Sequence, residues 1–294
     1  MRNYVYPAQT QTQSLGKLLV RVNSEANLRP IEDATIQITR TGDPTSIIEE
    51  IRTNSIGQTE TIELPAPPLD YSLEPDSSMP YSEYTLQISA PGFEDMTVSG
   101  SQILPTVTAV QESQLLPITA DPTSSELFVI SPHTLYYEYP PKIAEPEIKD
   151  VSNFDIVLDQ VVVPEYVVVH DGPPTDNSAK NHYVLYRDYI KNVASSEIYA
   201  TWPEATIQAN VLAIMSFTLN RVYTEWYRNK GYSFTITSST AFDHKWIAER
   251  NIFENISLVV DSIFNNFLSR PNVRQPILTQ YCDGVRVQCP NWMT

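Results

Sequence analysis

The sequence is poor in several residue types on which common folds and functions depend. Its 294 residues include 8 glycines, 2 cysteines, and 19 basic against 35 acidic side chains. Two cysteines exclude a disulfide-rich scaffold, and the C-x6-C spacing of Cys282 and Cys289 matches no common zinc motif. A net charge of −16 argues against nucleic acid as a partner, because clustered lysine and arginine carry affinity for phosphate backbones.

Long apolar runs are also missing. No stretch of about 18 apolar residues occurs, and the first 14 residues are too polar for the apolar core of a signal peptide. We therefore expect no insertion into a membrane. With 41% hydrophobic and 18% charged residues, the composition is that of a folded globular protein, and the length favours two domains.

Short runs of alternating apolar and polar residues occupy the first part of the chain. Turn signals such as Gly57 and Gly92 separate them, and this spacing predicts an antiparallel β-sandwich over residues 1–118. The phrases around Pro30, around Gly57 and over residues 84–93 resemble the transthyretin-type, carboxypeptidase-regulatory-like modules, which bind or space other domains and rarely catalyse. The alternating runs are residues 17–22, 34–39, 59–64, 84–89, 96–98 and 105–110.

A proline-rich segment follows, over residues 119–160. Prolines such as Pro132, Pro140 and Pro146 favour extended backbone and leave few donors for a regular sheet. The segment is therefore interpreted as a linker or as a docked strap. Residues 127–130 could add to the sandwich as an edge strand.

From Tyr183 onward the apolar period becomes helical, and one helix is predicted up to Ile198. A second helix is predicted to begin at a capping box made by Thr201 and Glu204 and to stop before Gly231. Its apolar residues cover much of its circumference, as expected of a largely buried helix.

A third helix is predicted from Asn251 to Arg270, with Pro271 as its stop. Residues 234–240 and 275–281 are predicted to be strands or loops. The second domain, residues 161–294, is therefore expected to be of the α+β class with long buried helices.

Most familiar catalytic constellations find little support. No Gly-x-Ser-x-Gly elbow occurs, and the four histidines are scattered along the chain. Cys282 could act as a nucleophile with His244 as its base, but a buried structural cysteine or a pair with Cys289 is the simpler interpretation. Asp243, His244 and a cysteine could in principle hold a metal, although such residues are more often only hydrogen-bonded.

One acid stands out at a corner between two predicted helices. Tyr186, Ile190, Val193 and Glu197 recur at spacings that place Glu197 on the apolar stripe of the first helix. Desolvation of that carboxyl would raise its pKa and let it donate a proton near neutral pH. The alternative is that Glu197 turns out to water at a frayed helix end.

Two aromatic residues follow this acid in the sequence. Tyr199 and Trp202 could form a wall on which a sugar ring stacks.

Residues 189–213, a helix ending in Glu followed by a Trp-Pro corner and an Ala- and Gln-rich helix, resemble the signature of the stage II sporulation protein D family. Residues 163–172 and 219–232, with the sandwich in front, resemble the clostridial spore cortex-lytic enzymes. The resemblance implies a lytic transglycosylase that cleaves spore-cortex peptidoglycan between N-acetylmuramic acid and N-acetylglucosamine and leaves a 1,6-anhydro sugar. It implies no cofactor.

The same resemblance assigns roles to particular residues. Glu197 stands where the family has its catalytic glutamate. Tyr281 falls near a family segment that lines the cleft and is the second implied catalytic residue. Ser196, Tyr199 and Trp202 are the implied substrate-binding residues. The sandwich is implied to be a pro-region that a germination protease removes in the spore.

The chain also departs from this family. Some members bind zinc through cysteine and histidine in the segment that corresponds to residues 237–244, where this chain has serines, so no metal is expected. Relatives continue past Thr294 with a Gln-Trp-Gly motif and a peptidoglycan-binding repeat, so the catalytic domain is expected to be incomplete. The competing hypothesis is a non-catalytic spore-coat or cell-envelope protein whose degenerate domain binds glycan.

Overall fold

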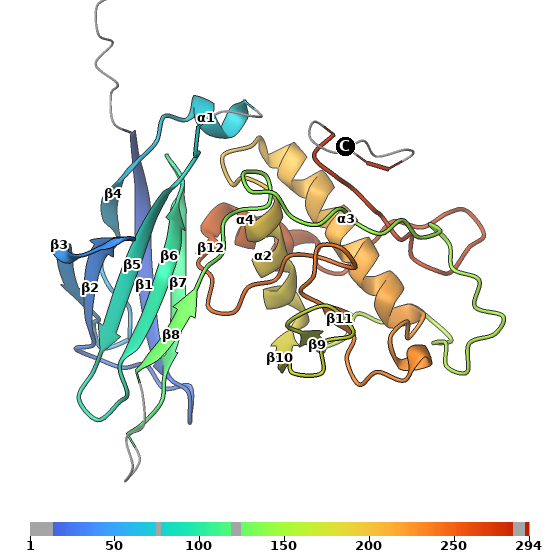
Figure 1. The fold of residues 1–294 in the computed structure, drawn as a ribbon, viewed down its shortest axis with the longest axis horizontal. Coiled ribbons are helices and arrows are strands. Elements are labelled where there is room, and N and C mark those ends of the chain that lie inside the picture. Colours follow the sequence, from blue (N-terminus) through green and yellow to red (C-terminus); the bar gives the residue numbers. More distant parts are fainter. Residues whose placement is uncertain (1–13, 75–77, 119–124, 285–291, 294) are drawn as a thin grey trace, which may run out of the picture.

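The structure is a computed structural model that describes residues 14–74, 78–118, 125–284 and 292–293. It places a β-sandwich beside a part built of three helices and a small sheet (Figure 1). Within the described ranges no helix is both long and apolar enough to cross a membrane. Cys289 lies outside the described residues.

Two sheets form the sandwich. One has the strand order β3-β2-β5-β6-β8, and the other has the order β12-β7-β1-β4. Each predicted alternating run lies within a strand or overlaps one. The edge strand predicted over residues 127–130 corresponds to β8. Strand β3 was not predicted. The strands are β1 (Ser14–Ser24), β2 (Thr35–Arg40), β3 (Asp43–Arg52), β4 (Ile62–Ala66), β5 (Ser82–Ser89), β6 (Met96–Ile103), β7 (Thr108–Leu115), β8 (Glu126–Val129) and β12 (Ile252–Phe253).

Alternation explains the core of the sandwich. Along β1, Leu18, Val20 and Val22 are fully buried, and they join Ile36 and Leu86 in one apolar core. Two of the strand pairs differ from the antiparallel prediction, because β1 pairs with β7 and β6 pairs with β8 in parallel. The chain reaches these pairings by crossing between strands that are distant in sequence.

The helical part contains α2 (Tyr186–Glu197), α3 (Glu204–Tyr223) and α4 (Glu254–Ile263). A small sheet of order β10-β9-β11 completes it; these strands are Asn181–Leu185, Tyr166–His170 and Ile236–Thr237. After α3 the chain makes the 3-10 turn η1 (Arg228–Lys230), and Gly231 then adopts a left-handed φ of 84°.

The predicted capping box is wrong. Helix α3 has Pro203 at its N-cap position and no side-chain cap. The hydroxyl of Thr201 instead donates to Ser72 Oγ at 2.7 Å, on the short helix α1 (Asp70–Leu73) of the sandwich. The hydroxyl whose oxygen was predicted to accept from the Glu204 amide thus bonds a residue in the other half of the molecule.

The third predicted helix is shorter than expected, because Ile252 and Phe253 form β12 and not a first helical turn. They pair with Val110 and Ala109 of β7, so a strand from the helical part completes a sheet of the sandwich. The helix then begins at Glu254 and ends at Ile263 rather than at Arg270.

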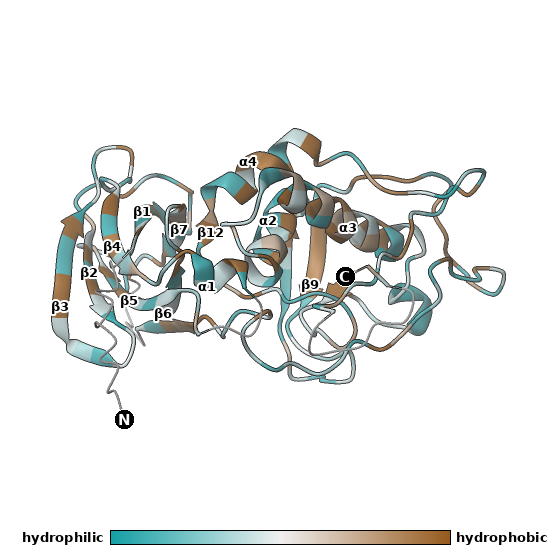
Figure 2. Ribbon diagram, turned by 90° about the horizontal axis from the view of Figure 1, so that it is seen from above, coloured by the Kyte–Doolittle hydropathy of each residue, from teal (hydrophilic) through white to brown (hydrophobic). Residues whose placement is uncertain are grey.

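This shared sheet is reinforced by buried polar contacts between the halves. Asn251 Oδ1 accepts from the backbone amide of Gln102 at 2.9 Å, and Asn251 Nδ2 donates to the backbone carbonyl of Gln102 at 2.9 Å. Arg250 donates to Gln102 Oε1 at 2.9 Å, and Gln111 donates to the Glu249 carbonyl at 2.9 Å. Figure 2 shows the two parts lying end to end with β12 between them.

We refer to residues 131–150 as the strap. In Figure 1 this green segment leaves β8 and runs across the helical part beside α3. Its backbone forms no regular strand or helix, as its prolines predict, yet it is hydrogen-bonded along its length: His133 N to Tyr81 Oη, Ile143 N to Ala241 O and Lys149 N to Gln275 Oε1. It is therefore docked.

Candidate functional site

Glu197 is the last residue of α2, and it is buried. Only 8% of it is exposed. The acid therefore lies on the buried apolar stripe of α2 and does not turn out to water at a frayed helix end. The apolar residues of the same stripe, Tyr186, Ile190 and Val193, are also buried, and they carry Glu197 into the interior with them.

Both carboxyl oxygens of Glu197 have a hydrogen-bond donor. The backbone amide of Lys245 donates to Oε1 at 2.6 Å, and the phenol of Tyr281 donates to Oε2. Burial raises the pKa of Glu197, while the ammonium of Lys142 and the Tyr281 hydrogen bond oppose that rise. The net result is a pKa above the ordinary value for glutamate, with the carboxyl fixed at both oxygens.

Tyr281 reaches Glu197 from a part of the chain that is 84 positions away. Its ring stacks on that of His244, with centroids 5.9 Å apart and planes 18° from parallel. Burial raises the pKa of Tyr281 well above its ordinary value, so the phenol keeps its proton and acts as a donor. The structure thus brings Glu197 and Tyr281 into direct contact.

His244 packs against Tyr281 of the Glu197–Tyr281 pair. It is fully buried, its Nδ1 lies 3.2 Å from the Tyr189 hydroxyl, and its ring packs 4.4 Å from that of Phe217. Burial lowers the pKa of His244 well below its ordinary value, so the imidazole is neutral. A neutral ring under Tyr281 adds no charge to the site.

A buried ion-pair network lies behind the site. Arg221 Nε donates to Asp243 Oδ1 at 2.7 Å, and Arg221 Nη2 donates to Glu145 Oε1 at 2.6 Å. Asp243 also accepts from the Tyr227 hydroxyl at 2.6 Å and from the Thr237 hydroxyl at 2.7 Å. This network fixes residues 243–245, and through them the amide that binds Glu197.

Asp243 and His244 are therefore accounted for by hydrogen bonds and ring packing. Within the described ranges, no group of three or more histidine, cysteine, aspartate or glutamate side chains is arranged to hold a metal ion. Cys282 is disulfide-bonded, which is incompatible with a thiol nucleophile at that position.

The implied substrate-binding residues lie toward the sandwich. The Ser196 hydroxyl donates to Asn192 O at 2.8 Å and accepts from Arg250 at 3.0 Å. The Tyr199 ring packs 4.5 Å from that of His133, and Trp202 Nε1 donates to Ser72 O at 2.9 Å. Of these contacts, the hydrogen bond from Trp202 to Ser72 joins the helical part to the sandwich.

Sequence reasoning missed three charged residues at the site: Lys142, Arg221 and Lys245. Each is an isolated basic residue in its segment, and no motif or spacing marks it. Their positions next to Glu197 and Asp243 result from tertiary contacts only. The Asp243-His244 dipeptide, which from the sequence was a candidate only for part of a metal site, lies next to Lys245 in the chain.

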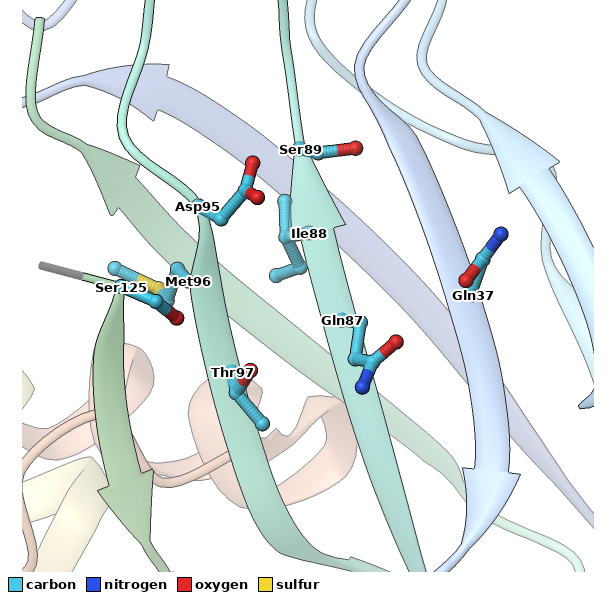
Figure 3. Close-up of a pocket in the computed structure, with 8 residues that line it drawn as sticks. All are labelled: Gln37, Gln87, Ile88, Ser89, Asp95, Met96, Thr97 and Ser125. Atoms are coloured by element: carbon cyan, nitrogen blue, oxygen red, sulfur yellow. The ribbon is translucent and has the colours of Figure 1, made fainter. Parts of the chain in front are cut away.

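The sandwich carries a separate polar pocket, which Figure 3 shows on its five-stranded sheet. Gln37, Gln87 and Thr97 stand on neighbouring strands there, and Asp95 lies at the start of β6. Within this pocket Gln37 Nε2 donates to Glu50 Oε2 at 3.0 Å. Its lining residues are Gln37, Gln87, Ile88, Ser89, Asp95, Met96, Thr97 and Ser125.

No family model and no curated protein matches the chain. Among solved structures, the Bacillus anthracis TIE protein is 13% identical with a TM-score of 0.25. The match covers 36% of this chain and 17% of that protein. The 3-chlorocatechol 1,2-dioxygenase of Rhodococcus opacus 1CP is 12% identical with a TM-score of 0.25, covering 37% of this chain and 63% of its own.

The 5-hydroxyisourate hydrolase of Klebsiella pneumoniae is 12% identical with a TM-score of 0.23, covering 35% of this chain and 92% of its own. Likenesses at these TM-scores do not indicate a shared function. The side chains around Glu197 are therefore the basis for assigning one.

Proposed function

We propose that the protein is a peptidoglycan lytic transglycosylase of the stage II sporulation protein D type, with Glu197 as its general acid and base. The observation that carries this proposal is one buried carboxyl with a raised pKa, fixed by the Lys245 amide and the Tyr281 phenol. The resemblance of residues 189–213 to that family supplies the reaction and the substrate class.

The proposed reaction needs a single carboxyl. Protonated Glu197 gives its proton to the oxygen that links N-acetylmuramic acid to N-acetylglucosamine, and the bond from C1 to that oxygen breaks. The C6 hydroxyl of the same muramic residue attacks C1, and the Glu197 carboxylate takes the proton of that hydroxyl. A 1,6-anhydro sugar leaves, and Glu197 is protonated again.

The surroundings of Glu197 suit both stages. Burial favours the protonated form that the first stage consumes. Two hydrogen-bond donors then stabilise the carboxylate until it takes the second proton. In this proposal Tyr281 is a positioning residue, because the described contact is with Glu197.

The remaining features follow the resemblance to the clostridial spore cortex-lytic enzymes. The proposed substrate is spore cortex peptidoglycan, the proposed location is the spore, and the sandwich is a transthyretin-type pro-region removed by a germination protease. The shared sheet formed by β12 and β7 gives the two halves a firm contact before any such removal.

Mass spectrometry of a peptidoglycan digest tests the reaction. The protein, before and after limited proteolysis, is incubated with cortex peptidoglycan, and we expect muropeptides that end in 1,6-anhydro-muramic acid. Products heavier by one water would assign the protein to the hydrolytic muramidases. No soluble product under either condition, and none from the strap variants described in the next subsection, would favour the glycan-binding hypothesis.

Glu197→Gln tests the assignment of the acid. The amide keeps the shape of the side chain but has no transferable proton, so the rate should fall on the order of 10²-fold or more. Glu204→Gln is the matched control, because Glu204 is exposed at the first residue of α3 and its substitution should leave the rate unchanged. Equal rates for both variants would remove Glu197 from the mechanism.

A further inference from the structure

Residues in the middle of the strap are hydrogen-bonded to the two segments that lead to Lys245 and Tyr281. Ile143 N donates to Ala241 O at 2.7 Å, and Ile143 O accepts from Gln280 Nε2 at 2.9 Å. Residue 241 leads into the segment that carries Lys245, and Gln280 precedes Tyr281. The strap is therefore fastened to both segments that hold the Glu197 carboxyl.

Lys142 points inward from this part of the strap. Its ammonium donates to Asp243 O and lies 4.8 Å from the Phe217 ring centroid and 5.6 Å from that of Tyr281. Burial lowers the pKa of Lys142, and attraction to Glu197 and Asp243 opposes that shift. The Lys142 amine thus lies beside the proposed acid, in contact with the Tyr281 ring.

Tyr139 of the strap packs against the side chain of Lys245. The Lys245 ammonium lies 5.0 Å from the Tyr139 ring centroid, and the Tyr139 hydroxyl donates to Pro132 O at 2.7 Å. Strap side chains therefore touch Tyr281 and Lys245, the two residues that hydrogen-bond the Glu197 carboxyl. With 8% of Glu197 exposed, a polysaccharide has no access to its oxygens in this arrangement.

The strap is anchored to the helical part more than to the sandwich at this point. Glu145 accepts from Arg221 at 2.6 and 3.1 Å and from Lys149, and its backbone amide donates to Gln280 Oε1 at 3.0 Å. The Arg221 side chain is fully buried, so this anchor is protected from water.

We propose that residues 139–145 of the strap are an internal blocker of the Glu197 site, with Lys142 as the plug and Glu145 as the anchor. This rests on the proposed function and names how that site is regulated. Separation of the sandwich from the helical part leaves the site closed as long as residues 139–145 stay bound. Displacement of Lys142 opens the site.

Chemical labelling of Glu197 tests the blocker without reference to any activity. The full protein is treated with a water-soluble carbodiimide and an amine, and labelling at Glu197 is measured by peptide mass spectrometry. Lys142→Ala and Glu145→Gln should label Glu197 at least about tenfold faster than the unchanged protein, because each loses charged hydrogen bonds that hold the strap.

Glu147→Gln is the matched control for Glu145→Gln. Glu147 is two residues further along the strap, and it pairs with Arg270 on the surface, where both side chains are largely exposed. This variant should label like the unchanged protein. Far-ultraviolet circular dichroism and the thermal midpoint show that each variant is folded, and Lys142→Ala keeps the test valid if loss of the Glu145 anchor unfolds the protein.

Release of muropeptides by the same variants distinguishes the two proposals. Faster labelling together with more 1,6-anhydro product supports both. Faster labelling with no anhydro product from any variant overturns the proposed function and leaves the blocker in place. Labelling of Glu197 at the unchanged rate in folded Lys142→Ala and Glu145→Gln overturns the blocker.

Discussion

The sandwich and the helical part bury different kinds of polar side chain. Among the described residues, those buried within 14–118 are uncharged serine, threonine and glutamine side chains, whereas residues 133–280 bury Glu197, Arg221 and Asp243 as well. A buried charge costs free energy unless it is paired and hydrogen-bonded. The polar interior of the sandwich therefore needs no charge pairing, whereas the helical part buries charges at a cost in folding free energy that their partners must offset.

Removal of a buried charge from the helical part should have the largest effect on stability. Asp243→Asn should lower the free energy of unfolding by about 3–5 kcal/mol, because it leaves Arg221 buried with one carboxylate fewer. Urea denaturation measures it. Arg270→Met removes an exposed ion pair with Glu147 and should cost about 0–1 kcal/mol. Similar losses of unfolding free energy in the two variants would show that the buried network stabilises the fold no more than an exposed ion pair does.

Glu249 is an acidic residue that lies where the two halves meet. Burial and, to a smaller extent, the negative charges of Glu126, Glu25 and Glu112 together raise its pKa to about 7. The unfolded value is the ordinary 4.5, so the folded state holds this proton more tightly and stability is lost as the pH rises from about 4.5 to about 7.

Glu249→Gln should therefore raise the free energy of unfolding by about 1–3 kcal/mol at pH 8 and change it little at pH 4. Urea denaturation at the two pH values gives the difference. Glu32→Gln, at an exposed position of the sandwich, is the control and should show no such pH-dependent gain. A gain for Glu249→Gln that is equal at pH 4 and pH 8 would rule out titration of this carboxyl as the cause.

The smallest expected effect tests one hydrogen bond between the halves. Trp202→Phe keeps an aromatic ring but loses the bond from Nε1 to Ser72 O, which should lower the free energy of unfolding by about 1 kcal/mol. Thermal unfolding followed by circular dichroism gives the change. Tyr183→Phe alters a side chain in a residue that is 77% exposed and should leave stability unchanged. A Trp202→Phe variant as stable as Tyr183→Phe would contradict the role of that bond.

Local patterns predicted much of the fold. Alternation located six of the sandwich strands, and helical period located α2 and the buried interior of α3, because both patterns record which side of an element faces the core. The prediction failed where a residue found its partner far away: Thr201 bonds Ser72 and not its own helix, and Ile252 pairs with β7.

Of the candidate site, the sequence identified Glu197 through its place on an apolar stripe, and the family resemblance added Tyr281. Neither pattern shows which residues surround that acid.

Patterns within a few positions are enough to predict the alternation of the sandwich strands, the helical stripe that carries Glu197 and the irregular backbone of the proline-rich strap. Tertiary packing places β12 in a sandwich sheet, brings Tyr281 and Lys245 to the two oxygens of Glu197, and puts Lys142 beside it. These contacts join residues tens of positions apart. Their geometry is set by the packing of whole elements, which no local period encodes.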